Sequence, residues 1–154
     1  MARVVSVKDA RNRDLRVLFD TSVLIPAWEE GLRDLDTKAA FLRTPPDLRS
    51  VHELVVWEFL RGKDLTKEKR ESRARWLRDQ SVRYLVNPPA KALETLQSLV
   101  ARKEARGSPV DAMLAACSIA SRGSIVIATG DADDFCWHPD IWIVEEFIKA
   151  GVCG

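Results

Sequence analysis

The sequence predicts a three-layer α/β fold, in which a parallel twisted sheet of four or five strands has helices on both faces. Two observations lead to this prediction. Short apolar segments alternate along the chain with segments of helical periodicity, which is the order expected of parallel strands joined by helical crossovers. The strand segments are also apolar without a break, as is typical of strands covered on both faces.

Length and composition predict one globular domain over residues 1–154, with residues 1–13 as a lead-in segment. The 24 Lys and Arg residues nearly balance 23 Asp and Glu residues, for a formal net charge of +1. This balance excludes a strongly basic nucleic-acid coat protein but permits a local basic face. No apolar run approaches the roughly 18 residues of a membrane helix, and no secretory signal is evident, so we expect no membrane association.

The cysteines are Cys117, Cys136 and Cys153. Their odd number and wide spacing indicate neither a disulfide framework nor a zinc site. We therefore expect the protein in a reducing cytoplasm.

The first half of the chain alternates strand and helix patterns. Residues 17–19 predict a buried strand, and Thr21 and Ser22 favour the start of a helix that runs to about Gly31. The further segments expected here are a helix over 36–43 stopped by Pro45 and Pro46, a short strand over 48–51, and a helix over 52–62 with Gly62 as C-cap.

The second half continues the alternation. A helix is expected over 66–79, a second core strand over 82–86 ended by Asn87, Pro88 and Pro89, and an amphipathic helix over 90–106 ended by Gly107. Ser108, Pro109 and Asp111 form a strong start for a buried helix that continues to Gly123. The chain then predicts strands over 124–128 and 141–144 and a last helix over 145–150.

Four carboxylates stand where a charge needs an explanation. Asp20 and Asp131 follow predicted strands, Asp111 opens a buried helix, and Glu58 lies within an otherwise apolar helix. Ligands of open α/β sheets bind at the carboxyl ends of the strands, and buried carboxylates that meet there repel one another unless a cation binds them. Oxygen ligands select Mg²⁺ or Mn²⁺, and the two histidines, His52 and His138, do not form a zinc-ligand pair.

Simpler explanations exist for each acid. Asp20 and Asp111 could each only cap a helix, Glu58 could pair with Arg61, and Glu53 could form a capping box with Ser50. At least one of Asp131, Asp133 and Asp134 is expected to be a plain turn residue.

A basic segment follows Glu58 directly. Residues 61–78 carry eight Arg or Lys against three Asp or Glu. This segment could bind a nucleic-acid backbone, with Arg61, Lys63 and Lys67 as candidates, or it could form a solvated helix face with internal ion pairs.

Four motifs together resemble the PIN-domain ribonucleases, above all the VapC-type toxins of prokaryotic toxin–antitoxin pairs. The motifs are Phe-Asp-Thr-Ser-Val-Leu from Phe19, Glu-Phe-Leu-Arg-Gly from Glu58, Pro-Val-Asp-Ala-Met-Leu-Ala-Ala from Pro109, and Ile-Ala-Thr-Gly-Asp-Ala-Asp-Asp-Phe from Ile127. The resemblance covers roughly residues 16–145 and implies a PIN-like fold.

The resemblance also implies a function. It makes the chain a metal-dependent endoribonuclease that uses Mg²⁺ or Mn²⁺, a toxin with a cognate antitoxin protein, and a homodimer. The catalytic acids carried over by the match are Asp20, Glu58, Asp111 and Asp131, and the metal ligands are Asp20, Asp111, Asp131 and Asp134. Thr21 and Thr129 could position ligands or a water by hydrogen bonds. Gly130 stands where the family often has a basic or polar residue, so a phosphate contact expected there is missing.

Two other functions remain open. A haloacid-dehalogenase-type phosphatase would also place an acid after a strand, but it usually needs a second Asp where this chain has Ser22. A PIN-like module that only binds RNA or protein is the other alternative.

Apolar residues on the first two helices predict a groove for a partner helix; they are Leu24, Ile25, Trp28, Phe41 and Leu42.

Overall fold

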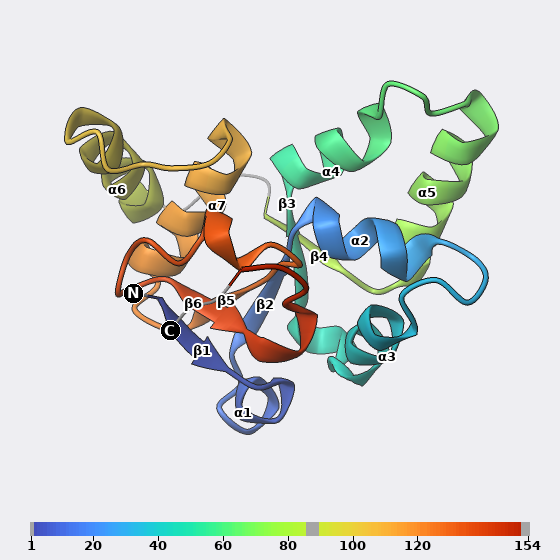
Figure 1. Ribbon diagram of the computed structural model, residues 1–154, viewed down its shortest axis with the longest axis horizontal. Helices are drawn as coiled ribbons and strands as arrows, with labels where there is room; N and C mark the ends of the chain where they lie inside the picture. The colour runs from blue at the N-terminus through green and yellow to red at the C-terminus, as the bar shows by residue number, and fades with distance from the viewer. Residues whose placement is uncertain (1, 86–89, 152–154) are drawn as a thin grey trace.

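The structure is a computed structural model that describes residues 2–85 and 90–151. In this part of the chain, six parallel strands form one sheet with the order β1-β6-β5-β2-β3-β4 (Figure 1). The strands are β1 (Arg3–Val5), β2 (Arg16–Phe19), β3 (Arg49–His52), β4 (Arg83–Leu85), β5 (Ile125–Ala128) and β6 (Trp142–Val144).

Helices lie on both sides of this sheet. They are α1 (Val7–Asn12), α2 (Thr21–Trp28), α3 (Leu35–Arg43), α4 (Glu53–Arg61), α5 (Lys67–Asp79), α6 (Ala90–Ala101) and α7 (Pro109–Ala120). In Figure 1, α2, α3, α4 and α5 occupy one side of the sheet and α6 and α7 the other. Right-handed crossovers produce this division, because the strand order advances from β2 to β4 and then returns to β5. The predicted fold class is therefore confirmed.

The sheet is wider than the four or five strands expected from the sequence. The lead-in segment forms β1, which pairs in parallel with β6, and then α1, whose N-cap Ser6 makes a capping box with Asp9. Residues 1–13 show no clear sequence period because β1 has only three residues, of which Arg3 and Val4 are exposed.

Other segments differ from the prediction at their ends. Strand β4 is an exposed edge strand rather than a core strand, and residues 86–89 of that prediction lie outside the described residues. Helix α6 ends at Ala101, where the chain turns through Lys103 at φ +57°, instead of continuing to Arg106. The capping box expected of Ser50 and Glu53 is absent, because β3 includes Ser50 and His52 caps α4 by accepting from Leu54 N.

The last predicted helix is a single 3₁₀ turn, Glu145–Phe147. The backbone after it pairs with another segment instead of with itself. Lys149 N and Ala150 N both donate to Gly130 O, at 2.8 and 2.9 Å. This tertiary pairing leaves no donors for a longer helix, and it holds the loop after β5.

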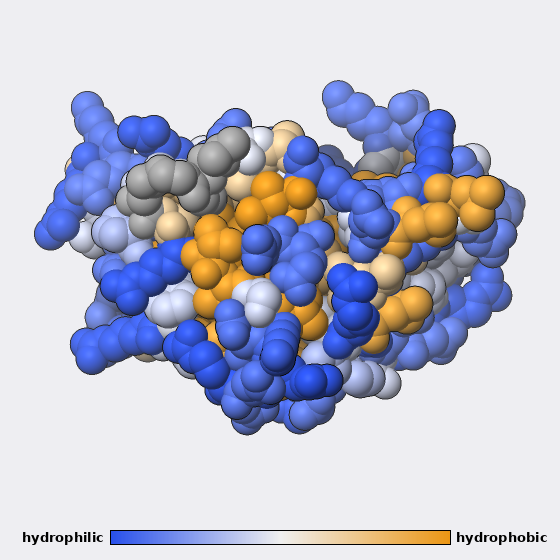
Figure 2. Space-filling view, turned by 60° about the horizontal axis from the view of Figure 1, so that its bottom comes forward, coloured by the Kyte–Doolittle hydropathy of each residue, from blue (hydrophilic) through white to orange (hydrophobic). Residues whose placement is uncertain are grey.

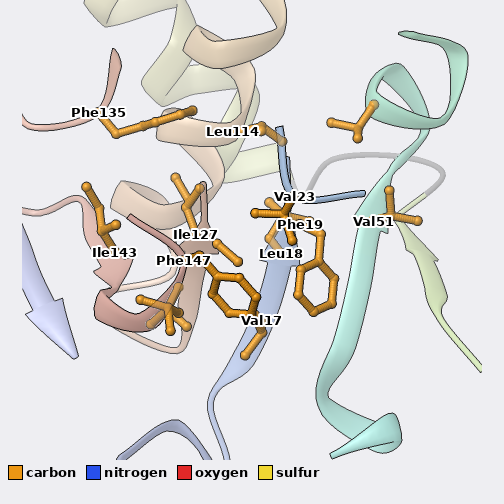
Figure 3. Packing of buried hydrophobic residues seen from close by; sticks show 14 of the residues in the cluster. Val17, Leu18, Phe19, Val23, Val51, Leu114, Ile127, Phe135, Ile143 and Phe147 are labelled. Carbon is orange, nitrogen blue, oxygen red and sulfur yellow. The ribbon is translucent and has the colours of Figure 1, made fainter. Parts of the chain in front are cut away.

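The core lies around the central strands (Figure 3). Val17, Leu18 and Phe19 of β2 are fully buried, as their unbroken apolar pattern predicts. The Phe19 ring contacts Phe41 of α3 and Phe147, with ring centroids 4.9 and 5.8 Å apart. Figure 2, turned so that the underside of Figure 1 faces the viewer, shows hydrophilic side chains around a central apolar area.

Two findings concern cysteines and membranes. Cys136 is disulfide-bonded, so the expectation that the cysteines indicate no disulfide is wrong, whereas Cys117 is a buried free thiol. Burial raises the pKa of the Cys117 thiol to about 11, which keeps it protonated and unreactive at neutral pH. Within the described ranges, none of the helices is long and apolar enough to cross a membrane.

Candidate functional site

Asp20 lies at the carboxyl end of β2, where three donors fix its side chain. Its Oδ1 accepts from Thr21 N at 2.8 Å, and its Oδ2 accepts from the hydroxyls of Ser22 and Thr129 at 2.8 and 3.0 Å. Only 7% of Asp20 is exposed. The residue therefore caps α2, as one of the two sequence interpretations predicts, and it also stands as a buried carboxylate at the sheet edge.

The pKa of Asp20 is raised above its ordinary value. Burial is the largest cause, and the negative charge of Asp111 adds to it. The hydrogen bonds from Ser22 and Thr129 act in the opposite direction because they stabilise the carboxylate. The net shift means that the metal-free site is electrostatically unfavourable for an ionised Asp20.

The pKa of Asp134 indicates that the other acids lie near it. Its pKa is raised to about 6, first by burial and then by the charges of Asp111, Asp131 and Asp20. The charges of Asp20, Asp111 and Asp131 thus all act on Asp134, and we call these four residues the aspartate cluster. Asp133, in contrast, is exposed.

Asp111 has two roles that the sequence presented as alternatives. It closes the capping box of α7, because its carboxylate accepts from Ser108 N at 3.0 Å while Ser108 Oγ accepts from Asp111 N at 3.1 Å. Its charge also raises the pKa of Asp20 and Asp134. Capping therefore fixes the carboxylate at the end of α7 that faces the other acids.

Glu58 joins the site through Thr21. The Thr21 hydroxyl donates to Glu58 Oε1 at 2.6 Å, while the backbone N of the same residue donates to Asp20. The alternative pairing of Glu58 with Arg61 is not observed, since the Arg61 guanidinium lies over the Trp57 ring at 4.4 Å. The structure thus brings Glu58 next to Asp20, although its charge is not among those that shift the pKa of Asp134.

Ser22 is a site residue to which the sequence analysis gave no role in the site. Its hydroxyl donates to Asp20 and accepts from Gly130 N at 2.9 Å, so it connects the loops after β2 and β5. A polar residue two positions after the acid, in the first turn of a helix, was the available signal. Thr129 has the supporting place expected of it, because it donates to Asp20 and accepts from Asp131 N at 3.2 Å.

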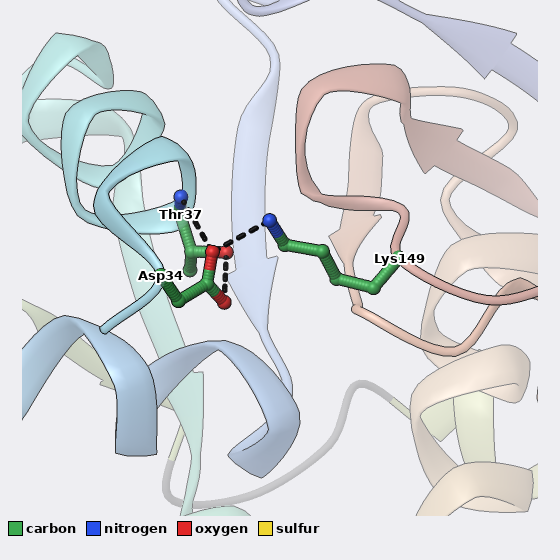
Figure 4. A network of polar contacts seen from close by, with 3 residues as sticks. All are labelled: Asp34, Thr37 and Lys149. Carbon is green, nitrogen blue, oxygen red and sulfur yellow. Dashed lines mark hydrogen bonds and ion pairs between the residues drawn. The ribbon is translucent and has the colours of Figure 1, made fainter.

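Lys149 anchors the acidic loop from the C-terminal side (Figure 4). Its amine forms an ion pair with Asp34, which also accepts hydrogen bonds from Thr37 at the start of α3. Burial alone would raise the pKa of Asp34, but the donors Lys149 and Thr37 hold that pKa below its usual value. Because Lys149 N donates to Gly130 O, this pair holds the loop of Asp131 and Asp134 against α3.

The basic segment places some of its cations beside Glu58. A cavity of about 350 Å³ is lined by Glu58, Lys63, Lys69, Arg73 and Trp28, with the acids Glu29 and Asp64 also on its wall. Of the candidates from the sequence, Lys63 therefore lies at the site, Arg61 stacks on Trp57, and Lys67 is exposed in the first turn of α5.

Arg73 is a second residue that the sequence did not single out. It is buried, its guanidinium lies 4.6 Å from the Trp28 ring and 4.9 Å from the Phe59 ring, and its Nη1 donates to Phe59 O at 2.7 Å. Among the residues that the structure describes, its Nε has no hydrogen-bond partner. Arg73 is buried because α2, α4 and α5 meet around it. The order of the residues in the sequence does not show that these helices meet.

The donor set of the aspartate cluster fits a hard divalent cation. All four members offer carboxylate oxygens, and the pKa of Asp134 is raised first by burial and then by the negative charge of the other three, which a cation would neutralise. In residues 2–85 and 90–151, however, no three His, Cys, Asp or Glu side chains already stand close enough to hold a metal ion. Metal binding would therefore require the side chains to move closer together.

Comparisons with known proteins agree with this geometry. Residues 17–136 match the model of the PIN-domain family. A crystal structure of DNA-bound VapBC from Salmonella typhimurium has a similar fold, with a TM-score of 0.65 and 18% sequence identity over 86% of this chain and 98% of that one. None of the curated proteins matches.

Proposed function

The chain belongs to the PIN-domain family, and we propose that it is a metal-dependent endoribonuclease that hydrolyses RNA phosphodiester bonds. The observation that carries the proposal is the aspartate cluster at the carboxyl ends of β2 and β5, where ligands of α/β sheets bind. The family match also speaks against the haloacid-dehalogenase alternative, because the matched region includes both strand–acid motifs.

In this proposal, Asp20, Asp111, Asp131 and Asp134 hold Mg²⁺ or Mn²⁺, and Glu58 acts beside them. The bound cation neutralises the phosphate, orients a water and lowers the pKa of that water. Hydroxyls of this chain keep the acids in place: Ser22 and Thr129 orient Asp20, and Thr21 orients Glu58. The reaction needs no nucleophilic side chain, because water attacks the phosphorus.

The cations beside Glu58 would hold the RNA. Lys63, Lys69 and Arg73 line the cavity next to this acid and balance the three acids on its wall, Glu29, Glu58 and Asp64, so a phosphate meets no net negative charge there. Arg73 is stacked on two rings, so its position is fixed before RNA arrives. This arrangement favours RNA contact over a purely solvated helix face for that part of the basic segment.

Cleavage of single-stranded RNA by the purified chain tests the proposal. We expect cleavage with Mg²⁺ or Mn²⁺ and none with a chelator. Single Asn substitutions should lower activity in the order Asp131, Asp134, Asp133, and the exposed Asp133→Asn variant is the matched control. An active Asp131→Asn enzyme with an inactive Asp133→Asn enzyme would reverse the assignment, and metal-independent cleavage would contradict the mechanism. A chain that binds RNA without ever cleaving it would indicate the inactive PIN-like module.

We also propose that the protein is the toxin of a type II toxin–antitoxin pair, acting in the cytoplasm with an antitoxin partner. The similar fold of a chain in the crystal structure of DNA-bound VapBC supports this assignment. The partner surface differs from the expected one, because Leu24 and Phe41 are buried in the core. A cavity of about 560 Å³ between α2 and α5, lined by Trp28, Arg33, Glu68 and Ser72 among others, and the exposed Leu42 remain available to a partner helix.

A further inference from the structure

Residues ahead of the family match build a cluster at the edge of the sheet. Strand β1 and helix α1 precede residue 17, where the match begins, and β1 extends the sheet beyond β6. The cluster consists of Arg3 in β1, Arg13 after α1, Arg122 after α7, and Trp142 at the start of β6. We call it the arginine–tryptophan cluster, and none of its residues belongs to the site described above.

Two arginines of this cluster stack on the ring of Trp142. The guanidinium carbons of Arg3 and Arg13 lie 5.1 and 5.2 Å from its ring centroid. Its ring packs on Gly123, where an added Cβ would lie only 3.2 Å from two ring atoms. The missing side chain at Gly123, which also has φ +90°, therefore allows the tryptophan to lie flat enough for arginines to stack on it.

The guanidinium groups of the cluster have hydrogen-bond donors that could bind a ligand. Arg3, Arg13 and Arg122 are exposed, and their guanidinium groups form no hydrogen bond or ion pair with any residue in 2–85 or 90–151. Arg3, Arg122, Trp142, Ile119 and Asp140 line a cavity of about 400 Å³. Two cations and one carboxylate thus share this cavity with the aromatic ring, Arg13 lies over the same ring, and each guanidinium has up to five donors.

The cluster is well separated from the aspartate cluster. Asp111 is in the first turn of α7, and Arg122 directly follows its C-terminal end. A helix of 12 residues is about 18 Å long, so the two sites lie roughly that far apart. In Figure 1, β1 and α1 lie at the lower left, whereas α4 and the start of α7 lie at the top.

We propose that the arginine–tryptophan cluster is a second RNA-binding site, which holds the phosphate backbone of the substrate outside the cleaved region. This inference rests on the proposed function for the identity of the ligand. Stacked arginines present rigid forks of donors that match phosphate oxygens in pairs. An RNA that reaches both sites gains affinity from the second, and the added lead-in segment supplies two of its three arginines.

Binding of labelled single-stranded RNA to the full-length Asp20→Asn chain with Mg²⁺ tests the inference without cleavage. We compare a long RNA with an oligonucleotide too short to reach both sites. The variant Arg3→Ala/Arg13→Ala/Arg122→Ala should bind the long RNA about tenfold more weakly, and the slope of log affinity against log salt should fall by about 2, since each lost phosphate contact removes about 0.7. Binding of the short oligonucleotide should not change.

Controls separate binding from folding. Arg102→Ala removes an exposed arginine elsewhere and should leave both affinities unchanged. If the triple variant melts at a lower temperature, Arg122→Ala alone, which removes no stacking contact, should still lower the salt slope. Unchanged long-RNA affinity in the triple variant, or an equal loss for both RNAs, would overturn the inference. Failure of the proposed function looks different: the wild-type chain would cleave neither RNA with Mg²⁺ or Mn²⁺, whatever the binding result.

Discussion

At the scale of single residues, the site combines negative charge with burial. Asp20 keeps its place through three hydrogen bonds, yet burial and Asp111 still raise its pKa. Asp134 is raised further, to about 6, by burial and three neighbouring aspartates. If a cation binds there, it would relieve this repulsion, so single substitutions should separate the proposed metal site from a set of helix caps.

Replacing Asp20 with Asn should raise the melting temperature of the metal-free protein. The change removes one charge from a buried cluster but keeps the shape, and Asn caps helices about as well as Asp. In a domain of this size, each kcal/mol gained raises the melting temperature by about 2–4 °C. The same variant should lose RNA cleavage and most of the stabilisation by Mg²⁺ or Mn²⁺. Melting curves of both proteins, with and without metal, decide this; identical metal responses would refute a shared metal site.

The stability of the protein should depend on pH through Asp134. Its folded pKa of about 6 lies above the ordinary value of 3.8, so between these values the folded chain binds more protons than the unfolded chain. The stabilisation is full below pH 3.8 and is lost as the pH rises through about 6. Metal binding shows the opposite trend, because it needs the carboxylate.

Melting temperatures from pH 3.8 to above 6, with and without Mg²⁺, measure both trends. We expect the increase caused by Mg²⁺ to be small below pH 6 and larger above it. In Asp134→Asn, the pH dependence of the metal-free protein in this window should flatten. A wild-type Mg²⁺ response that is the same on both sides of pH 6 would contradict the assignment.

At the scale of elements, helix termini position the acids. Asp20 is the N-cap of α2, and Asp111 is the third residue of α7, in a capping box with Ser108. The loop after β5 has no such helix, and it is held instead by the backbone of Lys149 and Ala150. Asp20 and Asp111 are thus held by hydrogen bonds to their side chains at the starts of helices, whereas Asp131 and Asp134 lie on a loop that is held through its backbone.

The two partners of the α7 capping box should behave differently when mutated. Ser108→Ala removes the side-chain acceptor for Asp111 N and should lower stability by about 1 kcal/mol, with the response to Mg²⁺ retained. Asp111→Asn keeps an oxygen for Ser108 N, so its stability should change less, but its response to Mg²⁺ should be lost. Denaturant unfolding with and without Mg²⁺ measures both effects. If Asp111→Asn responds to Mg²⁺ like the wild type, Asp111 is only a cap.

At the scale of the whole molecule, the sheet separates two surfaces. The carboxyl ends of β2 and β5 carry the acids, and the edge strand β1 and its neighbour β6 carry Arg3 and Trp142 of the arginine–tryptophan cluster. A third surface is apolar: Leu32, Leu35 and Leu42, in and just before α3, are 86%, 52% and 69% exposed. Exposed apolar side chains gathered in one region mark a contact surface.

We predict that the protein is a homodimer that uses the exposed leucines of α3. Light scattering at micromolar concentration should give twice the chain mass of 17.3 kDa. The variant Leu35→Ser/Leu42→Ser should shift this mass towards one chain, because both side chains lose apolar contact area. Leu93→Ser, on exposed α6, is the control and should remain dimeric. A wild-type chain that is only monomeric would contradict the prediction.

The sequence by itself determined the elements whose signals are local. Continuous apolar runs identified β2 and β5 because both faces of a central parallel strand are buried. Ser108, Pro109 and Asp111 fixed the start of α7 because a capping box needs only neighbouring residues. The candidate acids were also proposed from sequence, since Asp20 and Asp131 follow strands, Asp111 opens a helix, and Glu58 lies within an apolar helix where a charge is costly.

Only the tertiary structure decided what depends on distant segments meeting. The role of Ser22 needs Gly130, more than a hundred residues away, and the burial of Arg73 needs Trp28 and Phe59 from two other helices. The segment 145–150 does not form a helix because its backbone pairs with the loop after β5. Likewise, β1 has only three residues and no sequence period. It forms a strand because it pairs with β6, whose backbone hydrogen bonds stabilise it.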